Sequence, residues 1–349
     1  MLNIFCVECE GTAVDKLKTL CELSGVSGRE EAVRDYIIEQ IKDKAEVTVD
    51  QMGNVIAFVK GKKRAVKKVM ADAHMDEVGF YITYITDDGL LKFSPIGMNV
   101  SVFLGRRVKI GSVLGVIGIK PVHMLKDDAK EKMPDADSLY IDIGVSSREE
   151  AQKLVSMGDC AVFDEGYEVL GDLVVSKALD DRVGCWALID IINSEPEYDF
   201  YATFSVKEEV GFGARTAAYT IDPEFAVVLE STTAADIAGV EGEKRVCKVS
   251  GGAAISFMDN GTLYEKKLLD QVVALAKEKS IPCQLKSAVA GANNAAGIHK
   301  SRCGVRTVAM SVPCRYIHSA ASVASADDVK AVRNLAEATI NKMASGEIE

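Results

Sequence analysis

Apolar runs of strand length alternate with amphipathic helical segments in the first and last parts of the chain. Before residue 75, this pattern predicts a helix over residues 15–23 and strands over residues 47–60 and 66–73, with a turn at Gly53 and Asn54. Such alternation is typical of α/β domains. After residue 180 it returns, and it predicts helices near residues 181–191, 213–219, 266–279 and 327–343 and strands near residues 201–206, 225–229 and 305–312.

A further helix start is predicted just after residue 26. The segment Ser27-Gly-Arg-Glu30 matches a capping box, in which the serine hydroxyl and the glutamate side chain each bond a free amide of the first turn. Val33, Ile37 and Ile41 follow at helical spacing. We therefore expect Ser27 to cap a helix whose apolar face carries these three residues.

The pattern of apolar and polar residues changes between residues 79 and 171. Short alternating apolar runs separated by glycine-containing turns replace the helical segments, and only residues 147–157 keep a helical pattern. A polar stretch over residues 126–137 is expected to be a mobile loop. The simplest organisation is an α/β domain formed by residues 1–78 and 172–349, with a small β-rich domain, residues 79–171, inserted into it.

Composition narrows the class of protein. The chain has 349 residues, of which 48% are hydrophobic, and a formal net charge of −11, which argues against nucleic acid and anionic membrane surfaces as partners. No stretch has the form of a secretory signal or a membrane span. Nine cysteines lack a disulfide framework, and the close pair Cys6 and Cys9 has no second pair to complete a zinc site. We expect a cytoplasmic protein with free thiols.

Candidate functional side chains stand just after strand-like runs or at a helix start in five places. In an open α/β sheet, residues just past the carboxyl ends of the strands converge on one crevice. Two imidazoles and several carboxylates gathered there would form a cage for two divalent metal ions. The residues concerned are His74 with Asp76, Asp180 with Asp181, Glu208 with Glu209, Glu230, and His318.

Each of these residues also has an ordinary structural interpretation. For His74 it is a buried histidine paired with a carboxylate, and for Asp180 it is charge at a helix start. For Glu208 it is surface charge, and for Glu230 an ion pair with a nearby lysine or arginine. The metal interpretation gains weight because two of the chain's four histidines occupy equivalent places. Asp76, two residues beyond His74 on an extended segment, would point the same way and orient its ring.

The proposed donors are nitrogen and oxygen atoms, with no thiolate. This set favours zinc, cobalt or manganese over a cysteine-based structural site. The excess of carboxylates also leaves one group to act as a base. No Gly-x-Ser-x-Gly motif precedes a helix, and no phosphate-binding glycine loop is present. The sequence therefore gives no support to serine nucleophiles or nucleotide binding.

Motifs along nearly the whole chain resemble those of metallopeptidase family M42, the glutamyl and tetrahedral (TET-type) aminopeptidases, some of which are labelled endoglucanases. The motifs are Ala73-His-Met-Asp-Glu-Val-Gly79, Lys177-Ala-Leu-Asp-Asp-Arg182, Val206-Lys-Glu-Glu-Val-Gly211 and Arg315-Tyr-Ile-His-Ser319. The resemblance implies a mixed-sheet di-metal peptidase domain. It also implies that the inserted domain is a barrel-like dimerisation module, giving a dimer-based homo-oligomer that reaches a dodecamer in some members.

The resemblance also assigns metal ligands. Asp180 would bridge both metal ions. Glu209 and His318 would complete the site of one ion, and His74 and Glu230 that of the other.

Two further roles follow from the same resemblance. Glu208 would be the general base, and Asp76 the partner of His74. The chain departs from the family in one motif, because Gly291-Ala-Asn-Asn294-Ala has an amide where relatives usually carry an aspartate. Asn294 is not at a ligand position. We therefore expect this replacement of aspartate by asparagine to affect substrate recognition or support of the loop.

We therefore predict an aminopeptidase with two divalent metal ions, zinc or cobalt before manganese, that trims peptide substrates. The first rival is a metal-dependent deacetylase or carboxypeptidase on a similar cage. The second is a glycoside hydrolase with paired carboxylates, which leaves His74 and His318 without a role. A non-catalytic binding protein would not need Glu208 and the complete ligand set.

Overall fold

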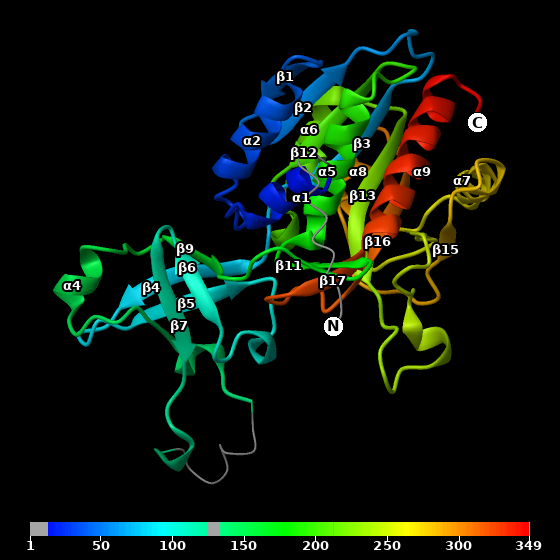
Figure 1. Cartoon of the computed structure of the whole chain (residues 1–349). Helices are drawn as coiled ribbons and strands as arrows, with labels where there is room; N and C mark the ends of the chain where they lie inside the picture. The colour runs from blue at the N-terminus through cyan, green and yellow to red at the C-terminus, as the bar shows by residue number, and fades with distance from the viewer. Residues whose placement is uncertain (1–12, 125–132, 212, 349) are drawn as a thin grey trace, which may run out of the picture.

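The computed structural model of the chain describes residues 13–124, 133–211 and 213–348, and it has two parts (Figure 1). One is an α/β body, and the other is a β-barrel that lies to its side. The predicted α/β fold with an inserted barrel-like segment is confirmed. The Cys6 and Cys9 pair and residues 126–132 of the predicted loop lie outside the described residues.

The body is built on a mixed sheet, 11-stranded within the described residues. β12 (Phe200–Ser205), β3 (Val69–His74), β13 (Phe225–Thr233) and β16 (Arg306–Arg315) run parallel in its centre. Beyond them, the other strands of the main path pair antiparallel. β14 (Ala253–Ile255) pairs with β16 and with β15 (Cys283–Leu285). The main path is β1 (Ala45–Val49), β2 (Val55–Val59), β12 (Phe200–Ser205), β3 (Val69–His74), β13 (Phe225–Thr233), β16 (Arg306–Arg315), β17 (Ser322–Ser325), β11 (Leu173–Ser176) and β10 (Glu168–Leu170).

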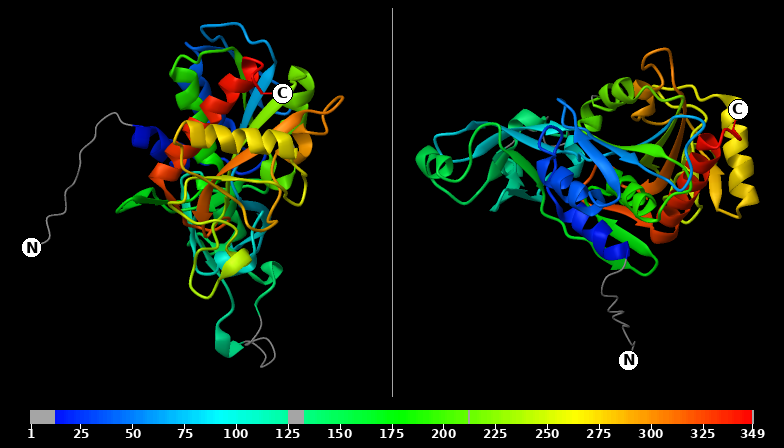
Figure 2. Two further views of the ribbon diagram at one scale, coloured as in Figure 1. Left: turned by 90° about the vertical axis from the view of Figure 1, so that its right-hand side faces the viewer. Right: turned by 90° about the horizontal axis from the view of Figure 1, so that it is seen from above.

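Helices cover both faces of this sheet, so its central strands are almost continuously apolar. In β3, Val69 and Ala71 belong to the core cluster on one face, and Met70 belongs to the cluster on the other. Figure 2 shows α7 (Lys266–Glu278) beside α9 (Ala326–Ala344). The first face carries α1 (Ala13–Glu22), α2 (Glu31–Ile41), α5 (Leu179–Asn193) and α9 (Ala326–Ala344), and the second carries α6 (Ala214–Ile221) and α8 (Ala295–Ile298). None of the helices described is long and apolar enough to cross a bilayer.

The barrel has its own core, centred on Phe80. The rings of Phe93, Phe103 and Phe163 meet the Phe80 ring edge to face, with centroids 5.1–5.5 Å away. Its strands close in the order β4 (Gly79–Ile85), β5 (Leu91–Ile96), β8 (Tyr140–Asp142), β7 (Val113–Gly118), β6 (Arg107–Ile110) and β9 (Cys160–Phe163). Short helices between them are η1 (Val100–Val102), η2 (Val122–Met124), η3 (Ala136–Ser138) and α4 (Arg148–Gln152).

Three local predictions need correction. The predicted helix over residues 147–157 is reduced to α4, which Ser147 caps through the Glu150 amide. The strand predicted over residues 225–229 continues to Thr233, because β16 pairs with it along that whole length. The capping box is wrong: α2 begins at Glu31, and the Glu30 side chain caps nothing in its first turn. Ser27 is instead used at the candidate site described next.

Candidate metal centre

The predicted site residues gather at the carboxyl ends of the parallel strands. His74 is the last residue of β3, and Glu208 and Glu209 form the turn η4 (Glu208–Val210) that follows β12. His318 follows β16. Glu230 was expected just after its strand, but it lies within β13 because that strand is longer than predicted. The topology therefore brings segments from four strands to one crevice, as expected for an open α/β sheet.

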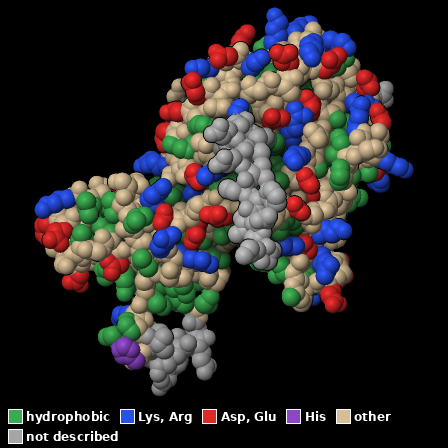
Figure 3. Space-filling view, in the orientation of Figure 1, with side chains coloured by type: hydrophobic (Ala, Val, Ile, Leu, Met, Phe, Trp, Pro, Cys, Tyr) green, Lys and Arg blue, Asp and Glu red, His purple; other side chains and the backbone are tan. Residues whose placement is uncertain are grey.

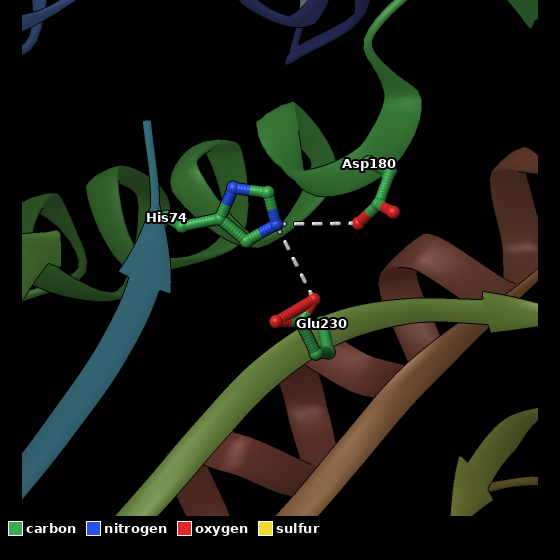
Figure 4. Close-up of side chains that lie close together, drawn as sticks. All are labelled: His74, Asp180 and Glu230. Carbon is green, nitrogen blue, oxygen red and sulfur yellow. Dashed lines mark ion pairs between the residues drawn. The ribbon is translucent and has the colours of Figure 1, made fainter. Parts of the chain in front are cut away.

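The side chains form two groups that share one aspartate. His74, Asp180 and Glu230 make the first group, and Asp180, Glu209 and His318 make the second. In each group the candidate ligand atoms all lie within 4.8 Å of one another. Figure 4 shows the first group, in which the Nε2 atom of His74 lies 3.4 Å from Oδ1 of Asp180 and 3.5 Å from Oε2 of Glu230.

Asp180 faces the two groups with different oxygens. Its Oδ1 atom is directed at His74, and its Oδ2 atom lies 3.2 Å from Nε2 of His318. The same histidine nitrogen lies 3.2 Å from Oε2 of Glu209. One carboxylate placed between two such groups can bridge two cations.

Several carboxylate oxygens of this centre have no hydrogen-bond partner in the described structure. They are Oδ1 of Asp180, Oε1 of Glu209 and Oε1 of Glu230, all buried. No lysine or arginine of the described residues forms an ion pair with these carboxylates. Buried carboxylates without a partner are costly, and a divalent cation is the natural compensation. The donor set of imidazole nitrogens and carboxylate oxygens fits zinc, cobalt or manganese.

The pKa shifts reflect the excess of negative charge at the centre. Burial raises the pKa of Glu230 to about 7 and, with Asp180 nearby, raises that of Glu209 well above its usual range. Burial alone would lower the pKa of His74, but the carboxylates of Glu230, Asp180 and Asp76 raise it far more. In the absence of metal, protons on these groups would supply the missing charge.

Asp76 holds both the histidine and the glutamate turn. Its carboxylate lies 3.3 Å from Nδ1 of His74 and accepts hydrogen bonds from the amides of Glu208 (2.9 Å) and Glu209 (3.1 Å). The Ser27 hydroxyl donates to it at 2.6 Å. This bond explains why the predicted capping box fails, since the hydroxyl is committed to a buried carboxylate 49 residues away.

The adjacent Asp180 and Asp181 have different roles, and the peptide bond between them is cis. Asp181 accepts hydrogen bonds from the amides of Gly184 (3.0 Å) and His74 (3.3 Å). It therefore acts as a helix cap and also anchors β3. Asp180, the preceding residue, is left to face the centre. Charge at a helix start, the ordinary structural interpretation given for Asp180, describes the neighbouring Asp181.

A buried ion-pair cluster supports these two segments. Glu77 accepts bonds from Nζ of Lys177 at 2.8 and 2.9 Å and from Arg182 at 3.3 Å, and all three side chains are buried. Arg182 also donates to the Met75 carbonyl at 3.0 Å. The cluster ties the residues after His74 to those around Asp180. It was not recognised as such in the sequence, although its members lie in the quoted motifs.

Comparison with known proteins decides the family. The model of M42 glutamyl aminopeptidases matches residues 53–335. The chain belongs to the M42 glutamyl aminopeptidase family. The predicted membership is confirmed, and the protein is a metallo-aminopeptidase, a hydrolase of peptide bonds. A candidate aminopeptidase of Acetivibrio thermocellus is 40% identical over 331 residues, which cover 93% of this chain and 97% of that protein.

Solved structures of M42 relatives match over nearly the whole chain. The aminopeptidase APDkam598 of the archaeon Desulfurococcus kamchatkensis has a TM-score of 0.91 and 35% identity, with 97% of this chain and 96% of that one covered. The TET1 peptidase of Pyrococcus horikoshii, described as able to assemble into a tetrahedron or a large octahedral shell, has a TM-score of 0.82 and 32% identity, with coverages of 96% and 99%.

Asn294, where the chain departs from the usual M42 motif, forms hydrogen bonds with two buried residues of the central strands. The Asn294 amide donates to Oδ2 of Asp72 at 2.9 Å and to the Ser205 hydroxyl at 2.8 Å. Burial raises the pKa of Asp72 to about 6. An aspartate at position 294 would therefore face a second buried carboxylate, whereas the amide supplies a donor. Asn294 supports β3 and β12 beneath the centre.

The M42 centre opens into a cavity of about 270 Å³. Asp180, Glu208, Glu230 and His318 line it, together with the end of β13 and the segment between β15 and α8. The other lining residues are Ser231, Thr232, Thr233, Lys286, Ala290, Gly291, Ala292 and Asn293, with Ser311 and Ile317.

The barrel also reaches the M42 centre, at Gly97 just after β5. Gly97 has φ +71°, a backbone conformation that residues with a Cβ atom rarely adopt. A Cβ atom there would lie 2.8 Å from Cγ1 of Val78 and 3.1 Å from Oε2 of Glu209. The barrel backbone therefore packs directly against a candidate ligand.

Proposed function

We propose that this M42 peptidase removes N-terminal residues from peptides at a centre of two divalent metal ions. The observation that carries the proposal is the pair of ligand groups that share Asp180. His74 and Glu230 would complete one site with Asp180, and Glu209 and His318 the other. When bound, such ions lower the pKa of a water molecule and polarise the scissile carbonyl.

Glu208 is the group that we propose moves the proton. Its side chain lines the cavity beside Asp180 and Glu230 but belongs to neither ligand group. Burial and the Glu230 charge raise its pKa well above the usual range, toward the pH at which a general base works best. Glu208 would accept the proton of the attacking water and return it to the leaving amine. Asp76 holds the Glu208 backbone in position for this transfer.

The proposal is tested with the full-length enzyme stripped by chelator and reloaded separately with zinc, cobalt or manganese. We expect the stripped enzyme to be inactive on a panel of aminoacyl-p-nitroanilides, and at least one metal to restore hydrolysis. The same anilides with an acetylated α-amine are the control, and an aminopeptidase should leave them intact. Full activity in chelator, or equal cleavage of acetylated substrates, would contradict the proposal.

We also propose that the barrel joins copies of this chain into a homo-oligomer. On the outward face of β7, Leu114 is 58% exposed and Val116 is 46% exposed. Figure 3 shows hydrophobic side chains gathered at the edge of the barrel where β7 and η1 lie in Figure 1. Two apolar runs, residues 95–98 and 100–104, follow in this part of the barrel. Val100 and Val102 in η1 are only half-buried against the barrel core. The assemblies described for TET1 of Pyrococcus horikoshii support this proposal.

The double substitution Leu114→Glu and Val116→Glu is expected to yield smaller particles, because like charges would face each other across an apolar contact. Size-exclusion chromatography with light scattering measures the change. Val66→Glu is the matched control, since Val66 is 69% exposed and belongs to the α/β body. Unchanged particle mass in the double variant would show that β7 is not part of the interface.

A further inference from the structure

The segment that carries Glu208 and Glu209 is held by side chains from distant parts of the chain. It leaves the end of β12, and the backbone amides of residues 206–209 each donate to a side-chain oxygen. The bonds, in chain order, are Val206 to Oδ1 of Asn54 (3.0 Å), Lys207 to Oε1 of Glu30 (3.1 Å), Glu208 to Oδ1 of Asp76 (2.9 Å) and Glu209 to Oδ2 of Asp76 (3.1 Å). Amides that leave a strand need such partners when they are buried.

Lys207 is the bend in this segment. Its φ of +60° lies in the left-handed region, which residues other than glycine rarely adopt. Such a conformation persists only where neighbouring contacts enforce it. Asn54 and Asp76 bind the amides before and after the bend, whereas Glu30 binds the amide of Lys207 itself. The Glu30 bond therefore fixes the direction in which the chain enters the turn that carries Glu208.

Glu30 is a buried carboxylate that does not serve its own helix. It stands just before α2, it is 5% exposed, and its side chain caps no amide of that helix. Its Oε1 atom accepts instead from the Gly28 amide at 2.7 Å and from Lys207, 177 residues away. Burial raises the pKa of Glu30, and these two bonds oppose that shift. A buried carboxylate is costly, and the bond to Lys207 gives this one a role outside α2.

The same short turn contacts the Glu208 segment a second time. The Ser27 hydroxyl donates to the Asp76 carboxylate, which binds the next two amides. Both residues of the predicted capping box, Ser27 and Glu30, thus face the candidate centre instead of α2. The Tyr81 hydroxyl of the barrel donates to the Ser27 carbonyl at 2.7 Å. Residues 27–30 therefore link the barrel to the segment that carries Glu208.

We propose that Glu30 is a positioning residue for Glu208: by holding the Lys207 amide, it sets the direction in which the Glu208 side chain enters the cavity. The inference rests on the proposed role of Glu208 as general base and adds a residue on which that role depends. Glu30 does not line the cavity and belongs to neither ligand group, so it acts through the backbone of the turn. Displacing a reacting group by about 1 Å can cost about 100-fold in rate.

The test measures kcat and KM of the metal-saturated, full-length enzyme on its best anilide. Glu30→Ala should lower kcat by about 10- to 100-fold and leave KM nearly unchanged, because the base is displaced while the metal ligands remain. Glu30→Asp should also lower kcat, since it keeps the buried charge but has a shorter side chain. Glu30→Gln keeps an oxygen acceptor at the same reach, so it should retain most of the wild-type kcat.

Glu31→Ala is the matched control, because Glu31 is the exposed neighbour at the start of α2. It should change neither constant. Wild-type kcat in Glu30→Ala and Glu30→Asp would overturn the proposal, and a lower melting temperature with that result would indicate a structural role. A kcat that recovers as more metal is supplied would also overturn it, because Glu30 would then act on the candidate ligand Glu209.

A double-mutant cycle with Glu208→Gln separates this inference from the proposed function. If Glu30 acts through Glu208, Glu30→Ala should lower kcat far less in the Glu208→Gln background than in the wild type. Equal losses in both backgrounds would overturn the proposal, because Glu30 would then act on another group. Near-normal turnover of Glu208→Gln would instead refute the general base, so the two failures are distinguishable.

Amide hydrogen exchange supplies a measurement that does not depend on catalysis. In Glu30→Ala, peptides that span residues 206–211 should exchange faster than in the wild type, because the Lys207 amide loses its acceptor. Glu30→Gln and Glu31→Ala should keep the wild-type protection there. Unchanged exchange in Glu30→Ala would show that Glu30 does not hold this segment.

Discussion

Glu208→Gln is expected to lower kcat by about 10²–10⁴-fold while metal content stays unchanged. Glutamine keeps the size and hydrogen-bonding reach of glutamate, but it cannot take up the proton of the attacking water. The metals should remain because Glu208 belongs to neither ligand group. The bond from its amide to Asp76 involves the backbone and is kept. Steady-state kinetics on the best anilide, together with elemental analysis, measure both quantities.

The neighbouring residue provides the control for that experiment. Glu209→Gln should weaken metal binding, because Glu209 faces His318 and Asp180 in the second ligand group. Its activity should recover, at least in part, when the metal concentration is raised. Excess metal should do nothing for Glu208→Gln. Near-normal turnover of fully loaded Glu208→Gln would show that another group takes the proton.

Asp180→Ala should abolish activity and reduce the metal content from about two ions per chain to near zero. The reason is that both groups use Asp180, one through Oδ1 and the other through Oδ2. The variant should still fold, since the substitution removes one carboxylate from a crowded buried cluster that includes Glu209 and Glu230. Elemental analysis and thermal melting distinguish metal loss from unfolding.

His318→Ala is the graded comparison for Asp180→Ala. His318 belongs to the second ligand group alone, so its loss should release roughly one of the two ions. If His318→Ala kept both ions, or Asp180→Ala kept one firmly bound, the shared-ligand arrangement would be wrong.

The sequence pattern predicts the elements that are buried on both faces. The runs that become β3 and β13 are mostly apolar, with Asp72 inside the first and Glu230 inside the second. Short strands such as β14 and β17 escape prediction, because three or four residues contain too little periodicity to detect. Their position depends on pairing with β16, which only the folded chain provides.

At the site, local motifs predict which residues meet, and long-range contacts decide how they are held. His74 and Glu209 could be nominated because each follows an apolar run. Asn294 bonds Asp72 across 222 residues, and nothing in either local sequence indicates the other.

The contact between Gly97 and Glu209 limits how this architecture can be recombined. The barrel resembles a cassette that could be exchanged between relatives or deleted, yet its backbone touches a group expected to hold metal. A chimera with alanine at position 97 would press on Val78 and Glu209, so a graft that preserves every ligand could still lose an ion. A chimera should therefore be joined at a point beyond residue 97, inside the barrel. The loop after β5 should come from the same protein as the α/β body.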